Sequence, residues 1–298
     1  MNDQTVIRVK DLTKYYGSRL GIKNLTFQVN RGEIFGFLGP NGAGKTTTIR
    51  LMLDLLKPTS GSIQLMGLDL PGKSLEIRNR TGYLPGDFTA YQHLTVEEFL
   101  RFISSIRQLP GKPESELIDL LSFRKNLNHK IKHLSHGNRQ KLGIIQTFIH
   151  QPELVILDEP TAGLDPIVQE QFYDFLQEYQ DRGNTIFFSS HNLPEVEKIC
   201  HRVAIIREGT LVALETLEHL KKKRYRRLKL ILGHEMPELA FEGAELIKSR
   251  NLEYEFLIKG DLAPILKKIA TLPVRDVVLP EPDLEEVFLY YYRGKDEQ

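Results

Sequence analysis

A glycine-rich segment near residue 40 has the composition and spacing of a loop that binds phosphate groups. It follows a short apolar run and precedes an amphipathic stretch, which is the strand, loop and helix context that such a loop requires. Glycines let successive backbone N–H groups point at phosphate oxygens, and the start of a helix adds partial positive charge. We expect Lys45 to reach the β- and γ-phosphates of a nucleoside triphosphate and the Thr46 hydroxyl to bind Mg²⁺. The candidate binding residues are Gly39, Pro40, Asn41, Gly42, Ala43, Gly44, Lys45, Thr46 and Thr47.

Two adjacent carboxylates, Asp158 and Glu159, follow a second apolar run at 154–157. Open α/β sheets bind ligands at the carboxyl ends of their strands, so we expect Asp158 to end a strand beside the phosphate-binding loop and to hold Mg²⁺ through water. Glu159 would orient and deprotonate an attacking water. An acidic pair after a strand is by itself more often a helix cap or a solvated turn. The upstream loop reverses that balance, and the lack of kinase-like phosphoacceptor residues favours hydrolysis over transfer.

The elements that position these residues follow from the hydrophobic pattern. Short apolar runs at 34–38, 154–157 and 185–188 lack alternation, as strands covered on both faces do, so each is predicted to be a central strand. Amphipathic stretches alternate with them, which indicates an α/β fold with a mostly parallel sheet. The helix after the loop should run from Lys45 to Pro58, with Ile49, Leu53 and Leu56 on its buried face.

A helical insert and a second domain complete the predicted architecture. Thr95 and Glu98 form a capping-box pattern, so residues 96 to about 150 should be chiefly helical. From residue 216 the pattern changes to short strands and two helices, at 262–269 behind an Asp261 cap and near 284–291. We therefore expect a nucleotide-binding domain over 1–220, with its insert at about 88–150, and a small α+β domain over 221–298.

Composition limits the kind of protein. The chain has 298 residues, 40 basic and 39 acidic, and a formal charge of +1, which gives no net field for holding nucleic acid. Its one cysteine, Cys200, cannot form an internal disulfide and fits a reducing compartment. The N-terminus does not resemble a secretory signal, and no apolar run approaches a membrane-spanning length. These features predict a soluble cytoplasmic protein.

Three further segments identify a family. Together with the loop and the 154–159 strand, they occur in the order and spacing of the nucleotide-binding subunits of ABC transporters, and the resemblance covers about residues 5 to 215. They are Leu134-Ser135-His136-Gly137-Asn138, Ala162-Gly163-Leu164-Asp165 and Ser190-His191. In that family two such domains pack head to tail around two ATP molecules. Each ATP contacts the phosphate-binding loop of one subunit and the signature segment of the other.

The resemblance assigns roles across the dimer. It implies that Ser135, Gly137 and Asn138 contact the γ-phosphate of ATP held by the partner, and that Asp165 links the two subunits. His136 and Asn138 depart from the usual Gly and Gln of the signature segment. A shorter amide at Asn138 should keep its contact. The alternative is that Ser135 and Asp165 are only helix caps.

Two residues complete the expected nucleotide site. The resemblance implies that His191 contacts the γ-phosphate and the attacking water. The alternative is that this histidine, which follows a strand, is a packed or capping residue. Tyr16, directly before Gly17, resembles the aromatic residue on which adenine stacks, and Tyr15 is the alternative.

One position departs more strongly from the family. A glutamine that reaches Mg²⁺ and water normally follows the 82–85 segment, but this chain has Gly86 and then Asp87. Either Asp87 supplies the oxygen ligand or the coupling uses backbone and water. This replacement and the 283–288 segment resemble the branch that serves exporters of drugs, antibiotics and polysaccharides, in which the membrane domains are separate chains.

We therefore predict an ATP-binding and ATP-hydrolysing subunit of an ABC exporter with ATP and Mg²⁺ as cofactors. It would form a homodimer, or a heterodimer with a similar subunit, and bind a separate integral membrane permease at the inner face of the cell membrane, without nucleic acid. The alternative is a soluble ABC ATPase acting on ribosomes, but those resemble tandem duplications with two loops. The basic run at 221–229 is either a solvated face or a surface for anionic lipid headgroups.

Overall fold

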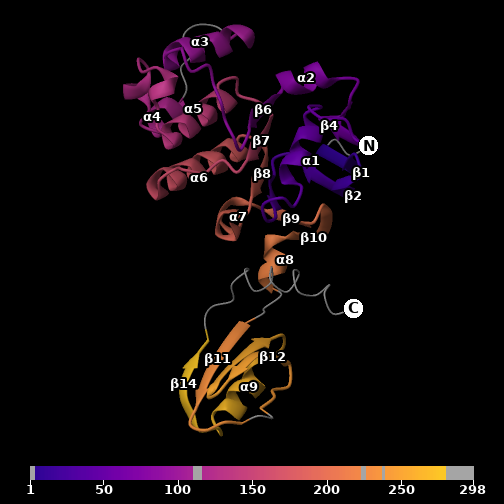
Figure 1. The fold of residues 1–298 in the computed structure, drawn as a ribbon, viewed down its shortest axis with the longest axis vertical. Helices are drawn as coiled ribbons and strands as arrows, with labels where there is room; N and C mark the ends of the chain where they lie inside the picture. The colour runs from indigo at the N-terminus through magenta and orange to yellow at the C-terminus, as the bar shows by residue number, and fades with distance from the viewer. Residues whose placement is uncertain (1–3, 110–115, 223–225, 237–238, 280–298) are drawn as a thin grey trace. The chain divides into compact units, whose positions relative to one another are not determined.

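The computed structural model describes residues 4–109, 116–222, 226–236 and 239–279 (Figure 1). Its contacts divide the chain into two compact units, Met1–Leu214 and Glu215–Gln298. Within the described ranges, no helix combines the length and the apolar character needed to cross a lipid bilayer. The helix predicted near 284–291 and the 283–288 segment lie outside the described residues.

A six-stranded sheet forms the centre of the first unit, with the order β10-β9-β3-β8-β7-β6. β3 runs parallel to β8 and β9, and β7 runs parallel to β6 and β8. The three apolar runs are inner strands with every residue buried, as the sequence predicts. The bounds are β3 Ile34–Leu38, β6 Thr81–Leu84, β7 Leu154–Asp158, β8 Thr185–Ser190, β9 Arg202–Arg207 and β10 Thr210–Thr216. As predicted, Asp158 ends a strand beside the phosphate-binding loop, since Thr46 donates to its Oδ2. In the sheet, β8 lies between β3 and β7.

Helices cover both faces of this sheet. In Figure 1, α1 (Lys45–Met52) lies on one side of β7 and β8, and α6 (Pro166–Asp181) and α7 (Leu193–Ile199) lie on the other. The prediction that α1 extends to Pro58 is wrong. The helix ends at Met52, because Asp54 takes a left-handed φ of 53°.

A second, antiparallel sheet packs against the central one and has the order β2-β1-β4-β5. Its strands are β1 Thr5–Tyr16, β2 Arg19–Asn30, β4 Ser60–Leu65 and β5 Leu68–Asp69. Four buried phenylalanines join the two sheets: the ring of Phe27 lies 5.8 Å from Phe35, 5.6 Å from Phe37 and 6.2 Å from Phe187. This shared core fixes the base of the phosphate-binding loop between the sheets.

The insert between β6 and β7 is helical but broken into short elements. It contains α3 Val96–Ile106, α4 Glu116–Leu120, the 3₁₀ turns Arg124–Asn126 and Ile131–His133, and α5 His136–Phe148, while the short α2 Ser74–Asn79 precedes β6. The predicted capping box is confirmed: the Glu98 N–H donates to Thr95 Oγ1 at 3.2 Å, and the Thr95 N–H donates to Glu98 Oε2 at 2.7 Å. This cap fixes the start of α3.

His150, two residues after α5, is a half-buried histidine whose buried Nδ1 has no hydrogen-bond partner among the described residues. Its Nε2 lies 3.3 Å from the Thr81 carbonyl oxygen. Burial, with a smaller contribution from the positive charge of Arg107, lowers the pKa of His150 to about 4. The folded protein therefore keeps this histidine neutral at pH values where an unfolded chain binds a proton.

We expect the free energy of unfolding to decrease as the pH falls from 6.5 towards 4. In that window His150 becomes protonated in the unfolded chain but stays neutral in the folded chain, which favours unfolding. His150→Gln removes the titrating group while its amide can still donate to Thr81, so its denaturant-unfolding free energy should fall less over the same window. His93→Gln, at an exposed position, serves as the matched control. An unchanged pH dependence in His150→Gln would contradict this account.

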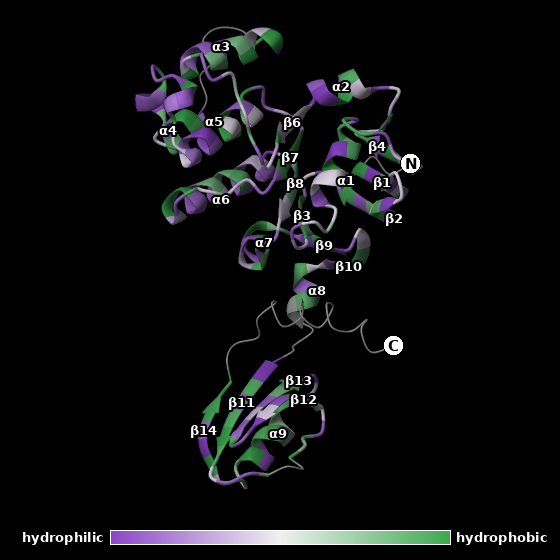
Figure 2. Ribbon diagram, in the orientation of Figure 1, coloured by the Kyte–Doolittle hydropathy of each residue, from purple (hydrophilic) through white to green (hydrophobic). Residues whose placement is uncertain are grey.

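The second unit is a small α+β domain. Its antiparallel sheet has the order β12-β13-β11-β14. The elements are α8 Leu217–Lys222, β11 Arg226–Leu232, β12 Ala244–Arg250, β13 Glu253–Ile258, α9 Leu262–Ile269 and β14 Val274–Val278. Figure 2 shows the hydrophobic residues of β11, β14 and α9 in green, and Leu228, Phe256 and Ile265 belong to the buried core.

The predicted cap of α9 is confirmed, since Asp261 Oδ1 accepts from the Ala263 N–H at 3.2 Å. Ile265 and Ile269 of α9 are buried, whereas Leu266 is 44% exposed. Residues 226–229 of the basic run belong to β11, where Arg227 and Lys229 pair with Glu255 of β13 at 3.9 and 3.7 Å. These pairs support the interpretation of that part as a solvated strand face.

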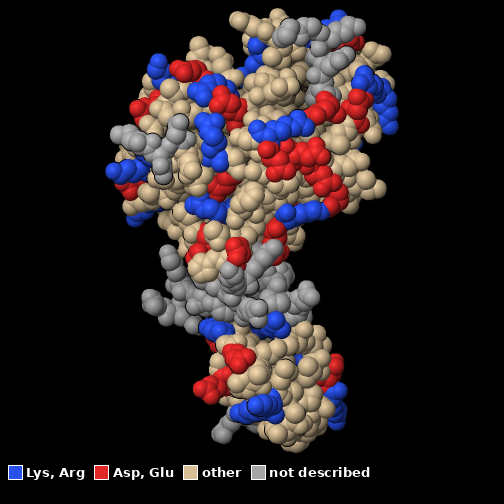
Figure 3. All heavy atoms as spheres, turned by 180° about the vertical axis from the view of Figure 1, so that it is seen from behind, with Lys and Arg blue, Asp and Glu red and all other residues tan. Residues whose placement is uncertain are grey.

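Charges of both signs are interspersed over the first unit. On the face shown in Figure 3, basic and acidic side chains lie close to one another.

Candidate functional site

The phosphate-binding loop connects β3 to α1 and depends on its glycines. Gly44 has a φ of 109°, and a Cβ there would lie 2.6 Å from Ile22 Cγ2. A Cβ at Gly39 would lie 2.4 Å from the Ile206 carbonyl oxygen. Lys45 is buried, and its Nζ donates to the Gly39 and Pro40 carbonyl oxygens at 2.6 and 3.1 Å. The loop therefore wraps around its own lysine ammonium.

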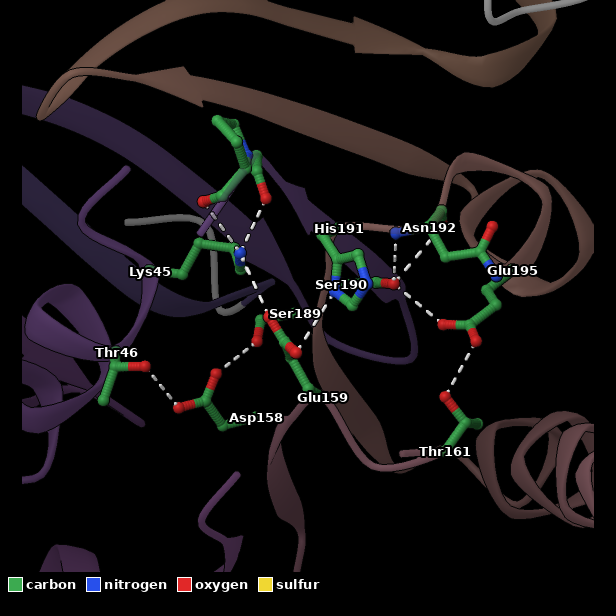
Figure 4. A network of polar contacts seen from close by, with 12 residues as sticks. Lys45, Thr46, Asp158, Glu159, Thr161, Ser189, Ser190, His191, Asn192 and Glu195 are labelled. Atoms are coloured by element: carbon green, nitrogen blue, oxygen red, sulfur yellow. Dashed lines mark hydrogen bonds and ion pairs between the residues drawn. The ribbon is translucent and has the colours of Figure 1, made fainter. Parts of the chain in front are cut away.

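Asp158 is buried at the end of β7, and hydroxyl groups occupy both of its oxygens (Figure 4). Thr46 Oγ1 donates to Oδ2 at 2.7 Å, and Ser189 Oγ donates to Oδ1 at 2.6 Å. Thr46 is the second residue of α1, and Ser189 lies opposite Asp158 in the register of β8 and β7. Helix, strand and loop thus place an oxygen-rich cluster at the carboxyl edge of the sheet.

Glu159 links the loop lysine to the histidine that follows β8. Its Oε1 lies 3.2 Å from Lys45 Nζ, and its Oε2 lies 3.1 Å from His191 Nδ1 (Figure 4). The backbone of Glu159 is left-handed, with a φ of 51°, which costs a residue with a side chain about 1–3 kcal/mol. Such strain persists where the surroundings hold the residue, and it occurs most often at functional sites. Here it directs the carboxylate into the cleft.

An open cleft of about 460 Å³ lies over the loop, in the size range of small-molecule sites. The expected residues that line it are Tyr16, Asn41, Gly42, Gly44, Lys45, Thr46, Thr47 and Glu159. Tyr16 is 45% exposed, and its hydroxyl lies 3.4 Å from Thr47 Oγ1. Tyr15 is not among the lining residues, so the geometry favours Tyr16 as the aromatic platform.

The cleft fits a magnesium ion that arrives with a nucleotide. Within the described parts of the chain, no group of three or more His, Cys, Asp or Glu side chains could hold a metal alone. Mg²⁺ commonly uses only one or two protein oxygens and completes its ligands with phosphates and water. The Thr46 hydroxyl and the Asp158 carboxylate, in direct contact at 2.7 Å, supply such oxygens.

The position of the missing glutamine lies beside the same carboxylate. A Cβ added at Gly86 would lie 3.7 Å from Asp158 Oδ2, whereas Asp87 is exposed. Gly86 is therefore next to Asp158 in this structure.

The segments expected to face a partner subunit lie together but away from the cleft lining. Ser135 Oγ accepts from the Asn138 N–H at 3.2 Å, and Asp165 Oδ1 accepts from the Val168 N–H at 3.1 Å, so both residues are helix caps. A Cβ at Gly137 would lie 2.6 Å from the Gly163 carbonyl oxygen, which shows that the two segments pack tightly. One chain alone does not bring Ser135, Gly137, Asn138 or Asp165 to the cleft.

Several polar residues at this site were not among the sequence candidates. Ser189 could have been found from the parallel pairing of β7 and β8, which aligns it with Asp158. Arg19 and Arg50 line the cleft, and Glu195 contacts both Thr161 and Ser190. These contacts join loops distant in sequence, and no spacing pattern signals them.

The fold and the loop define a P-loop nucleotide-binding protein. A family model described as ABC transporter matches residues 22–162. The bacitracin transport ATP-binding protein BcrA of Bacillus licheniformis is 39% identical over 231 residues, covering 77% of this chain and 76% of that protein. A solved structure of an ATP-binding subunit of an ABC transporter aligns with a TM-score of 0.67 and 32% identity, covering 73% of this chain and 92% of that one. The chain belongs to the family of ABC transporter ATP-binding proteins.

Another relative is considerably longer than the matched region. The probable multidrug ABC transporter ATP-binding protein YbhF of Escherichia coli is 38% identical over 222 residues. This match covers 73% of the present chain but only 38% of that relative. The alignment therefore concerns one nucleotide-binding domain and not the whole relative.

Proposed function

We propose that the chain is the ATP-binding and ATP-hydrolysing subunit of an ABC exporter. The observation that carries this proposal is the continuous contact from Lys45 through Glu159 to His191, beside the Thr46, Asp158 and Ser189 cluster. It supports the proposal because Lys45, Thr46 and Glu159 line the cleft. Asp158 and His191 lie just outside that lining, in direct contact with Thr46 and Glu159 respectively. Hydrolysis needs a phosphate-binding cation, a general base and magnesium ligands together.

In the proposed hydrolysis, the phosphates of ATP would replace Glu159 as the partner of Lys45. Its ammonium is now held by Glu159 and two loop carbonyls, and phosphate oxygens of ATP would compete for it. Phosphate binding would free the Glu159 carboxylate to accept a proton from the attacking water, with His191 holding its other oxygen. Bound Mg²⁺ would neutralise charge on the phosphates, with Thr46 and Asp158 as its protein ligands. Asp87, the residue after Gly86, stays a weaker proposal as a ligand.

Dimerisation would complete each site. We propose that Ser135, Gly137 and Asn138 of one copy contact the γ-phosphate bound by the other, and that Asp165 contacts the opposing subunit. ATP would then touch both copies only in the closed dimer and would favour closure by its differential affinity. The partner copy is either identical or a similar subunit.

A separate permease is the proposed membrane partner. The names of two relatives refer to multidrug and bacitracin transport, which supports the exporter class. We propose that the subunit is cytoplasmic and peripheral on the inner face of the cell membrane through that permease. Purifying the tagged full chain from detergent-solubilised membranes tests this directly, with co-purification of an integral membrane protein as the expected result. A ribosome-bound fraction without a membrane partner would favour the alternative of a ribosome-acting ATPase.

Tyr16→Ala is expected to weaken ATP binding about 5- to 150-fold, the loss that corresponds to ~1–3 kcal/mol of stacking on adenine. GTP binding should weaken by a similar factor, since stacking is tolerant of the base. Equilibrium binding of the nucleotides to the purified chain measures both. Tyr15→Ala is the matched control, because Tyr15 is comparably exposed but outside the cleft lining. Equal losses in the two variants would contradict the role of Tyr16.

A further inference from the structure

Glu195 on α7 bridges two loops that leave the central sheet. Its Oε1 accepts from Thr161 Oγ1 at 2.8 Å, and its Oε2 accepts from Ser190 Oγ at 2.8 Å (Figure 4). Thr161 is 5% exposed and Ser190 is 2% exposed, so both hydroxyls are buried. Each carboxylate oxygen thus accepts from one buried hydroxyl, that of Thr161 in the loop after β7 and that of Ser190 at the end of β8.

The two loops carry the groups that the proposed mechanism must coordinate. Thr161 follows Glu159 in the segment that ends at Asp165, the residue proposed to contact the opposing subunit. Ser190 directly precedes His191, which contacts Glu159, and Ser190 Oγ also accepts from the Asn192 N–H at 2.9 Å. Both ends of the bridge therefore lie within a few residues of Glu159 and His191.

The packing of α7 does not depend on this bridge. Leu193, Val196 and Ile199 are buried on its apolar face, and Lys198 makes an ion pair with Glu170 of α6. The helix is therefore anchored by other residues. The two contacts of Glu195 act on the loops instead.

We propose that Glu195 is a positioning residue that clamps the 160–165 loop to Ser190 and His191, so that the loop facing the partner subunit and the histidine of the ATP site move together. This inference rests on the proposed function. Through the clamp, closure of the partner subunit on Asp165 would place His191 and Glu159 for hydrolysis, and loss of γ-phosphate would be felt at the interface. The clamp acts after nucleotide binding, because neither Glu195 nor Thr161 lines the cleft.

The test compares Glu195→Ala with Glu195→Gln in the full chain. Glu195→Ala should lower the turnover number for ATP about 10- to 100-fold, since a small misplacement of reacting groups has that effect. Its ATP dissociation constant should stay as in the native chain. Glu195→Gln should restore most of the turnover, because an amide can accept from one hydroxyl and donate to the other. A general structural defect would instead lower the midpoint of thermal unfolding and weaken nucleotide binding together.

Two further variants separate the clamp from general packing. Thr161→Val should reproduce the loss in turnover, and the Thr161→Val, Glu195→Ala double variant should lose no more than the larger single effect. Glu170→Ala, which removes the ion pair of Lys198 in α7, should keep native turnover. Native turnover in Glu195→Ala, or additive losses in the double variant, would overturn the clamp while leaving the proposed function intact. A native chain that does not hydrolyse ATP would overturn the proposed function itself.

Discussion

Replacing Glu159 with Gln is expected to lower the turnover number for ATP by about 10²- to 10⁴-fold while ATP binding is retained. The amide keeps the size of the side chain and can stay in contact with Lys45 and His191, but it cannot accept a proton from water. Removing the negative charge also releases Lys45 from its ion pair at 3.2 Å, which should favour phosphate binding. Steady-state phosphate release and equilibrium ATP binding on the purified chain measure the two effects separately.

Glu208→Gln is a closely matched control for this variant. Glu208 also has a left-handed backbone, with a φ of 49°, and its side chain is 81% exposed. The same chemical change at the same backbone conformation should leave turnover unchanged. A Glu159→Gln chain that hydrolyses ATP at the native rate would show that this carboxylate is not the base.

Lys45→Ala is expected to affect the step before chemistry. Charge-assisted hydrogen bonds to phosphate contribute about 1.5–3 kcal/mol each, so loss of Lys45 contacts to two phosphates should weaken ATP binding by about 10²-fold or more and abolish measurable turnover. Titration of the variant with ATP and Mg²⁺, followed calorimetrically, measures the change in affinity. The two substitutions together separate binding from hydrolysis, because only Lys45→Ala should lose the nucleotide.

The control for this prediction is Lys73→Ala. Lys73 is an exposed lysine paired with Glu76 and lies outside the cleft lining. It removes the same charge from the chain, so any general effect of net charge on ATP affinity would appear there. If Lys45→Ala and Lys73→Ala bind ATP equally well, the loop does not hold the phosphates.

The central strands and helix caps were predictable because their signals are local. The runs that form β3, β7 and β8 lack polar alternation, and only strands buried on both faces tolerate that composition. Thr95, Ser135 and Asp261 cap helices as predicted, since a hydroxyl or carboxylate before an amphipathic stretch satisfies free N–H groups wherever the helix packs. The glycines of the phosphate-binding loop identified its position for the same reason.

Features that depend on packing between distant segments were not predictable. In the sheet, β8 lies between β3 and β7, and no local sequence pattern predicts this order of strands. α1 ends at Met52 because the backbone of Asp54 is left-handed. The apolar pattern does not reveal this end, since Leu53, the residue after Met52, is still buried. The contacts of Asp158 with Ser189 and of Glu195 with Thr161 join segments about 30 residues apart, so they emerge only from the three-dimensional register.

The central claim is that two copies of this chain close around ATP, and the mass of the Glu159→Gln chain in solution tests it most directly. Light scattering in line with gel filtration should give the monomer mass of 34.3 kDa without nucleotide and twice that mass with ATP and Mg²⁺. Ser135→Arg, added to the same chain, should prevent the doubling by placing a bulky side chain where the γ-phosphate contact is proposed. A Glu159→Gln chain that binds ATP and still has the mass of a monomer would contradict the closure of two identical copies around ATP.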